Sequence, residues 1–229
     1  MKISFEERRE SVIFRIENFD GKYEPVMAGC FYQRDWASYF KQFLKSTKDL
    51  ATIQLNYACY AEEMFNQMGL FNPAPWENGL EEFIKRVGGT KIEWWLTGSC
   101  ASCIRGIQLN PHDIDIMIDS RDVDAVHSLF IDRIFEPILD TNGWVTKDFG
   151  VIFLHARIDI ASDPQSSLDH PETVDCGPYA KEHLEEVIWR GFPVKLPPIQ
   201  LQINVNKRRK RDDRVKILQE FLAKNGCVS

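Results

Sequence analysis

The stretch EWWLTGSCASCIRGIQLNPHDIDIMID, residues 93–119, contains the features from which the fold can be predicted. Asp113 and Asp115 alternate with aliphatic residues at 114, 116 and 118. Such alternation is typical of a strand with one buried face, and residues two apart then project from the same side. Two parallel carboxylates repel each other unless a cation lies between them, and a divalent metal is the usual solution. The pattern therefore predicts a metal-binding strand.

A turn precedes this strand and predicts the other half of a site. The apolar run Trp94–Leu96 breaks at Thr97, Gly98 and Ser99, and about two helical turns are expected from Cys100 to Ile107. Gly98 has no Cβ, so backbone can approach a ligand closely there. Ser99 occupies the expected N-cap position, ahead of a helix whose free amides can hold a phosphate. An anion cradle beside an acid pair suits a metal-bound nucleoside triphosphate.

These two motifs resemble the signature of the nucleotidyltransferase superfamily, whose fold polymerase beta and antibiotic nucleotidyltransferases share. The sequence is most similar there to small bacterial antibiotic-adenylyltransferase and toxin-type members. In that family a Gly-Ser turn precedes an Asp-x-Asp strand, and a third acid comes from a later strand. Asp159 matches that third acid, because it lies in the alternating run 156–160 after a predicted strand-helix-strand unit.

The resemblance also implies the roles of the site residues. The catalytic and metal-binding residues would be Asp113, Asp115 and Asp159, holding two Mg²⁺ ions. The donor, a nucleoside triphosphate, would be bound by Gly98, Ser99 and Arg211. Arg211 is included because small relatives carry a similar basic-then-acidic stretch in a carboxy-terminal helix pair, although the cationic run 207–211 also suits a solvated face.

The activity that the resemblance implies is transfer of a nucleoside monophosphate, AMP from ATP, to a hydroxyl of a small molecule such as an aminoglycoside. Asp159 is the expected general base, and a separate acid such as Glu185 is an alternative. Two other functions stay open. One is toxin-type modification of tRNA or a protein, and the other is a catalytically silent nucleotide-binding or interaction protein. The acceptor and the oligomeric state are not determined by these motifs.

Composition limits the class of protein. The 229 residues are 44% hydrophobic and carry a net charge of −6, so a full core is expected and a general nucleic-acid coat is disfavoured. No apolar run approaches a membrane span, and the first nine residues do not resemble a signal peptide. We therefore expect a cytosolic protein with no membrane partner. Its six cysteines, including Cys227, are expected to be reduced.

The predicted architecture is α/β (α+β), with a small mixed β-sheet flanked by helices. Residues 81–229 are expected to form the nucleotidyltransferase core with carboxy-terminal helices, and residues 1–80 a mainly helical extension. In that extension we predict a strand at Ser11–Glu17 and a helix over 35–68, whose aromatic residues recur at helical spacing. The polar segment 161–180 is predicted to be a loop that closes over substrate.

Three competing interpretations concern single features of this sequence. Cys100 and Cys103 form a C-x-x-C motif typical of thioredoxin-like redox proteins, but redox chemistry does not explain the acidic strand after it. Zinc binding would need a second ligand pair beyond the isolated His112 and His155. The two acids at 113 and 115 also suit an ordinary solvated strand face.

Overall fold

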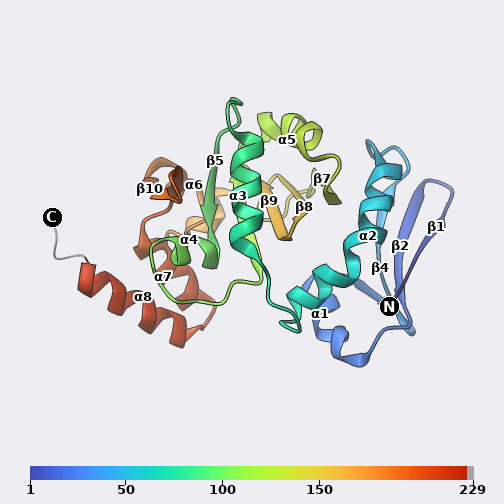
Figure 1. Cartoon of the computed structure of the whole chain (residues 1–229), viewed down its shortest axis with the longest axis horizontal. Coiled ribbons are helices and arrows are strands. Elements are labelled where there is room, and N and C mark those ends of the chain that lie inside the picture. The colour runs from blue at the N-terminus through green and yellow to red at the C-terminus, as the bar shows by residue number, and fades with distance from the viewer. Residues whose placement is uncertain (226–229) are drawn as a thin grey trace.

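The computed structural model describes residues 1–225, and its largest sheet has five strands in the order β5-β6-β9-β8-β7 (Figure 1). Strands β6 and β9 are parallel, and the other neighbours are antiparallel. The mixed sheet that the sequence predicts is therefore present. Its strands are β5 (Trp94–Thr97), β6 (Asp113–Ile118), β7 (Ile134–Asp140), β8 (Asp148–Leu154) and β9 (Ala156–Ser162).

One face of this sheet is aliphatic and is covered by α3 (Trp76–Val87), which crosses it in Figure 1. Alternation along β6 and β9 places Ile114 and Ile158 on the covered face, where both are fully buried. Gly79 allows the close approach of helix to sheet, because a Cβ there would lie 2.3 Å from the carbonyl oxygen of Leu154. The acidic residues of the same strands consequently project from the opposite face.

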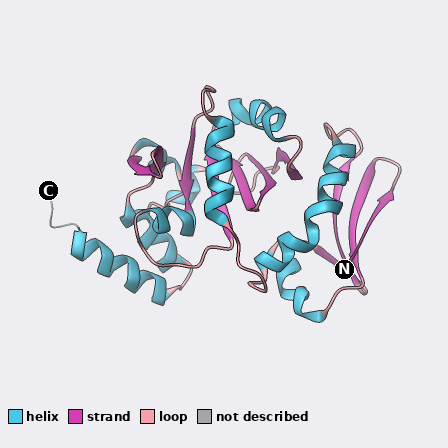
Figure 2. Cartoon of the chain, in the orientation of Figure 1, coloured by secondary structure: helices cyan, strands magenta, loops and turns pink. Residues whose placement is uncertain are grey.

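The amino-terminal extension contains a four-stranded antiparallel sheet, ordered β1-β2-β4-β3 (Figure 2). The strand predicted at Ser11–Glu17 is confirmed as β2. The mainly helical character expected for residues 1–80 is wrong, since helix α2 begins only at Leu50. The elements are β1 (Lys2–Glu7), β2 (Ser11–Glu17), α1 (Glu24–Gly29), β3 (Gln33–Asp35), β4 (Ser38–Leu44) and α2 (Leu50–Met68).

The error has a physical cause in residues 35–44. Aromatic side chains spaced three and four apart suit a helix, but aromatic residues also favour strands, where they pack against cross-strand neighbours. Tyr39 and Phe40 pair in register with Ile16 and Arg15 of β2, and Phe43 packs edge-on at 4.9 Å from Phe14. Packing against an existing strand therefore outweighs the local helical spacing.

The remaining elements follow the main sheet along the chain. They include a hairpin and the carboxy-terminal helices expected within residues 81–229. These elements are α4 (Gly98–Ile104), α5 (Val123–Phe130), α6 (Pro178–Glu182), β10 (Glu185–Trp189), β11 (Phe192–Leu196), α7 (Ile199–Arg208) and α8 (Asp212–Asn225), with short 3-10 turns at Gly21–Tyr23, Ser120–Asp122 and Ser166–Asp169.

A shared hydrophobic core joins the extension to the main sheet. Tyr57 of α2 stacks on Phe135 of β7 at 4.4 Å and meets Phe14 of β2 edge-on at 5.1 Å. All three rings are completely buried. A division of the chain near residue 80 remains a prediction. Among the described residues, no helix is both long and apolar enough to cross a membrane.

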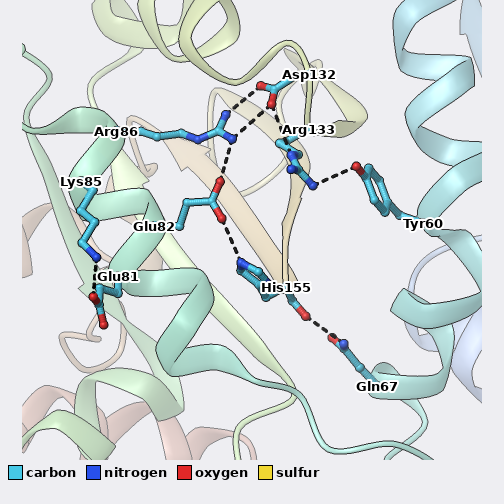
Figure 3. A network of polar contacts seen from close by, with 9 residues as sticks. All are labelled: Tyr60, Gln67, Glu81, Glu82, Lys85, Arg86, Asp132, Arg133 and His155. Carbon is cyan, nitrogen blue, oxygen red and sulfur yellow. Dashed lines mark hydrogen bonds and ion pairs between the residues drawn. The ribbon is translucent and has the colours of Figure 1, made fainter.

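Polar contacts also connect α2, α3 and the turn between β8 and β9 (Figure 3). Glu82 of α3 contacts both Arg86, at 2.7 Å, and the imidazole of His155, at 3.0 Å. Gln67 of α2 donates to the His155 carbonyl at 2.9 Å. These contacts give His155 a structural role at this turn, in place of the zinc-ligand role considered for it above.

Candidate active site

Three carboxylates converge on the uncovered face of the main sheet. In the parallel register of β6 and β9, Asp115 lies directly beside Asp159, and Asp113 lies two residues earlier on the same face. One oxygen from each acid lies within 4.8 Å of the other two. The structure thus brings together the three acids that the sequence predicts, and they form an acidic triad consistent with metal binding.

The electrostatics of the triad favour a cation. Burial raises the pKa of Asp115 well above its ordinary range, and the charges of Asp113 and Asp159 raise it further. Burial also raises the pKa of Asp159, although the neighbouring Arg157 opposes this effect. An all-oxygen donor set of crowded carboxylates fits a hard divalent ion such as Mg²⁺. The residues present therefore fit the metal that the sequence predicts.

Gly98 lies directly against this triad. Its φ is +67°, a left-handed conformation, and a Cβ there would lie 2.0 Å from Asp115 Oδ2. The Gly98 amide donates to Asp175 Oδ2 at 3.2 Å, and Gln202 Nε2 donates to the Gly98 carbonyl at 2.8 Å. Hydrogen bonds to the Gly98 amide and carbonyl therefore hold the turn. Glycine is required there because the backbone is left-handed and because a Cβ would have no room.

Ser99 lies in the first turn of α4, and the N-cap predicted there is wrong. Thr97 is the N-cap, with extended backbone, because it is still paired with Asp115 in the sheet. The helix consequently begins at Gly98, immediately after the strand ends. Ser99 nevertheless lines the same cavity as Gly98.

A small cavity of about 100 Å³, here called the cationic cavity, opens beside the triad. Arg209, Arg211 and Arg214 line it together with Asp113 and Asp115. Burial lowers the pKa of Arg211, and the charges of Arg209 and Arg214 lower it further. Clustered guanidinium groups that repel each other are stabilised by a bound anion, and their fork geometry suits phosphate.

Four residues of this region were not predicted as site residues. Asp175 lies in the polar segment 161–180 and Gln202 in α7, and neither stands out from its neighbours in sequence. Arg209 and Arg214 flank Arg211, and the cationic run could have indicated Arg209. Only tertiary contacts reveal which of these polar side chains point toward Gly98 and the acids.

His112 and Glu185, two other candidates from the sequence, lie in different surroundings. His112 lines the cationic cavity, with Nε2 3.5 Å from Asp113 Oδ2. Glu185, the alternative base, pairs with Arg105 at 2.7 Å on the hairpin. That ion pair gives Glu185 a structural partner outside the triad.

The C-x-x-C cysteines are free thiols. Cys100 Sγ donates to the Asp113 carbonyl at 3.2 Å, and Cys103 Sγ lies 3.7 Å from the Leu109 carbonyl. Burial raises the pKa of both thiols. Because redox chemistry needs the thiolate, this environment is unfavourable for it. Cys30, Cys59 and Cys176 are also free, and Cys227 lies outside the described residues.

Comparison with known proteins shows what the part of the chain that contains this site is similar to. Residues 80–166 match the family model Aminoglycoside-2''-adenylyltransferase. The matched range contains the Gly98 turn and all three acids. It covers 87 of the 229 residues, so the similarity to this family is one of the central part of the chain.

A solved structure is also similar to this chain. It is the 1.87 Å crystal structure of a "putative nucleotidyltransferase" from Thermotoga maritima, with 17% sequence identity and a TM-score of 0.49. The similarity covers 66% of this chain and 94% of the other. No curated protein sequence matches the chain significantly.

Proposed function

We propose that this protein is a metal-dependent nucleotidyltransferase that transfers a nucleoside monophosphate, AMP from ATP, to a hydroxyl group of a small molecule. The observation that supports this best is the convergence of three carboxylate oxygens within 4.8 Å of one another. The turn at Gly98 and the cationic cavity adjoin them. The family name makes an aminoglycoside-like compound the first acceptor to assay.

The cationic cavity is the proposed site of the triphosphate. Arg209, Arg211 and Arg214 offer paired donors to phosphate oxygens, and Ser99 offers a hydroxyl on the same wall. The absence of a Cβ at Gly98 leaves room for the carboxylate of Asp115 beside this cavity. Neutralising several phosphate charges in one small cavity explains why three arginines converge there.

Asp113, Asp115 and Asp159 would hold Mg²⁺, two ions in the proposed reaction. The bound metal supplies positive charge that stabilises charge developing on the phosphate oxygens. The acceptor hydroxyl oxygen forms a bond to the α-phosphorus, the bond from that phosphorus to the α,β-bridging oxygen breaks, and pyrophosphate leaves. Asp159 accepts the hydroxyl proton, because it lines the neighbouring groove and, unlike Asp113 and Asp115, does not line the cationic cavity.

Calorimetric titration with ATP, GTP, CTP and UTP, with and without Mg²⁺, tests this proposal. Wild type should bind one triphosphate in a metal-dependent way, and Asp113→Asn should lose that binding. Asp124→Asn is the matched control, since Asp124 is an exposed acid on α5 whose removal changes the net charge equally. Absence of any triphosphate binding would contradict the proposal.

Product formation is the second measurement. α-³²P-labelled ATP should label a small hydroxyl acceptor and release unlabelled pyrophosphate, and Asp115→Asn should abolish both. A macromolecular acceptor is the alternative prediction, and total tRNA in the same assay tests it. Labelling of tRNA but not of small molecules would show that the proposed acceptor class is wrong and that the proposed chemistry is right.

A further inference from the structure

A groove extends from the acidic triad toward the amino-terminal sheet. Its inner part has a volume of about 280 Å³ and its outer part about 340 Å³. Phe31, Trp144 and Phe149 line both parts, so the two form one continuous space. A space of this size suits a small organic ligand.

The triad lies where this groove meets the cationic cavity. Of the two spaces, Asp113 lines only the cationic cavity and Asp159 only the inner groove, while Asp115 and Arg209 line both. Because Arg211 and Arg214 line only the cavity proposed to hold the phosphates, the attacking group is expected from the groove. The groove is therefore the approach to Asp159, the proposed base.

Aromatic side chains line the groove walls, and two of them are unusually exposed to solvent. Phe31 and Trp144 meet edge-on at 5.8 Å, and Trp144 meets Phe149 in the same way at 5.8 Å. Phe31 is 68% exposed and Trp144 45%. Large apolar side chains left in water together are unfavourable, and such patches commonly mark binding sites. These two rings come from segments more than 100 residues apart, so they form a clamp only in the folded chain.

The backbone holds Phe31 in a strained conformation. Its φ is +62°, a left-handed value that is rare for a bulky residue. Backbone hydrogen bonds fix this turn, from the Phe31 amide to Ala28 at 3.1 Å and from the Tyr32 amide to Met27 at 3.0 Å. Strain of this kind persists only where the surrounding structure fixes it, and it concentrates at active sites and ligand clamps. Burial cannot be the reason for it, since the ring is mostly exposed.

Two carboxylates of the groove are paired with protein cations, although Asp115, Asp175 and Arg209 also line its inner part. Glu136, in the outer part, accepts hydrogen bonds from Lys41 Nζ at 2.5 Å and Tyr32 Oη at 2.9 Å. Asp159 accepts one from Arg157 Nε at 2.5 Å. The outer part, with apolar walls and a compensated Glu136, therefore favours a flat, weakly charged group.

We propose that the acceptor carries a planar apolar group, which packs against the exposed parts of the Phe31 and Trp144 rings while its hydroxyl reaches Asp159. This inference rests on the proposed nucleotidyl transfer and narrows its acceptor class. The aromatic clamp provides the affinity and orients the molecule, and the inner groove provides room for the part that bears the hydroxyl.

Saturation-transfer NMR with phenyl β-D-glucoside and methyl β-D-glucoside tests the clamp directly. The two probes carry the same sugar hydroxyls and differ in the planar group. The phenyl protons should receive saturation from wild-type protein, and the methyl compound should show at least tenfold less. Equal transfer to both probes would overturn the proposal.

Variants locate the binding. Trp144→Ala and Phe31→Ala should each reduce phenyl glucoside binding at least tenfold. Phe31→Gly relieves the left-handed strain but should reduce binding to the same extent. The measured loss is then due to removal of the ring and not to a change in backbone strain. Trp36→Ala is the matched control, because Trp36 is also exposed and left-handed but lies outside the groove. Binding retained in both clamp variants would overturn the proposal.

Triphosphate binding separates this inference from the proposed function. Calorimetric affinity for Mg²⁺-ATP should be unchanged in Trp144→Ala and Phe31→Ala. A tenfold weaker triphosphate affinity in these variants would assign the clamp to the nucleobase and overturn the acceptor site. If no protein variant binds Mg²⁺-ATP but the phenyl probe still binds the clamp, the proposed function fails while the aromatic site stands.

Discussion

Arg157 Nε donates a hydrogen bond to Asp159 Oδ1 at 2.5 Å, and both side chains project from the same face of β9. Arg157 is 3% exposed, so the pair is a buried one. The guanidinium also lies 3.4 Å from Cys30 Sγ in the amino-terminal extension. The third acid of the triad is thus oriented by a side chain that itself contacts the extension.

Arg157→Met should destabilise the protein by about 3 kcal/mol, because it leaves a buried carboxylate without its cation. Urea unfolding measures the change. The double variant Arg157→Met with Asp159→Asn should recover much of the loss, since the unpaired charge is then removed. Additive losses in the double variant would show that the pair is not coupled.

Gly98→Ala should abolish metal-dependent triphosphate binding, because the added Cβ would displace the carboxylate of Asp115. The left-handed backbone adds a destabilisation of roughly 1–2 kcal/mol for a residue with a Cβ. Gly106→Ala is the control, since Gly106 also has positive φ but its added Cβ would meet open space. Both variants should lose similar stability in thermal unfolding, and only Gly98→Ala should lose binding in calorimetry. Equal binding in the two would contradict the close packing at the triad.

The triad should make the metal-free protein less stable as pH rises. Burial and the neighbouring acids raise the pKa of Asp115 in the folded state, so its protonated form favours folding. That stability is fully present below the unfolded pKa, about 3.9, and is lost as pH rises through the elevated folded value. Asp115→Asn should therefore have a higher unfolding midpoint than wild type at pH 7 with a chelator, and a smaller advantage near pH 4.

Mg²⁺ should reverse the order of the unfolding midpoints of wild type and Asp115→Asn. At neutral pH the ion should raise the unfolding midpoint of wild type and leave Asp115→Asn nearly unchanged, because binding to the folded state alone stabilises it. Differential scanning calorimetry with and without the ion measures both effects. A metal-induced rise of equal size in the variant would place the ion elsewhere.

Arg211→Ala should weaken Mg²⁺-ATP binding by about tenfold to a hundredfold, as expected for loss of charge-assisted contacts to phosphate. Lys210→Ala is the matched control: Lys210 is the adjacent cation, is exposed, and lies outside the lining of the cationic cavity. Calorimetry at two salt concentrations should show a smaller salt dependence for Arg211→Ala only. Equal losses in both variants would indicate a diffuse charge effect.

Strand alternation and turn chemistry were sufficient to predict the acid pair and the turn at the centre of this protein. Asp113 and Asp115 had to share a face once their segment was a strand, because side chains two apart project from the same side. The Gly98 turn was equally visible, since its chemistry is local. Asp159 and the mixed sheet were instead implied by the resemblance to the nucleotidyltransferase superfamily, and Asp159 joins the pair because β9 pairs with β6 in register.

The amino-terminal sheet was not predictable in the same way. The aromatic residues of 39–44 satisfy both helical and strand spacing, and only pairing with β2 decides between them. Likewise, Asp175 and Gln202 reach Gly98 from 77 and 104 residues away along the chain. Their roles depend on long-range packing that leaves no local pattern.

The sequence by itself determined the acidic strand and the glycine turn, because each depends on the geometry of a few neighbouring residues. Tertiary structure alone decided what surrounds them. It placed Asp159 beside Asp115, brought Arg209, Arg211 and Arg214 into the cavity of Asp113, and packed Phe31 against Trp144. These contacts join segments that are distant in the chain, so they exist only once the hydrophobic core has packed the segments together.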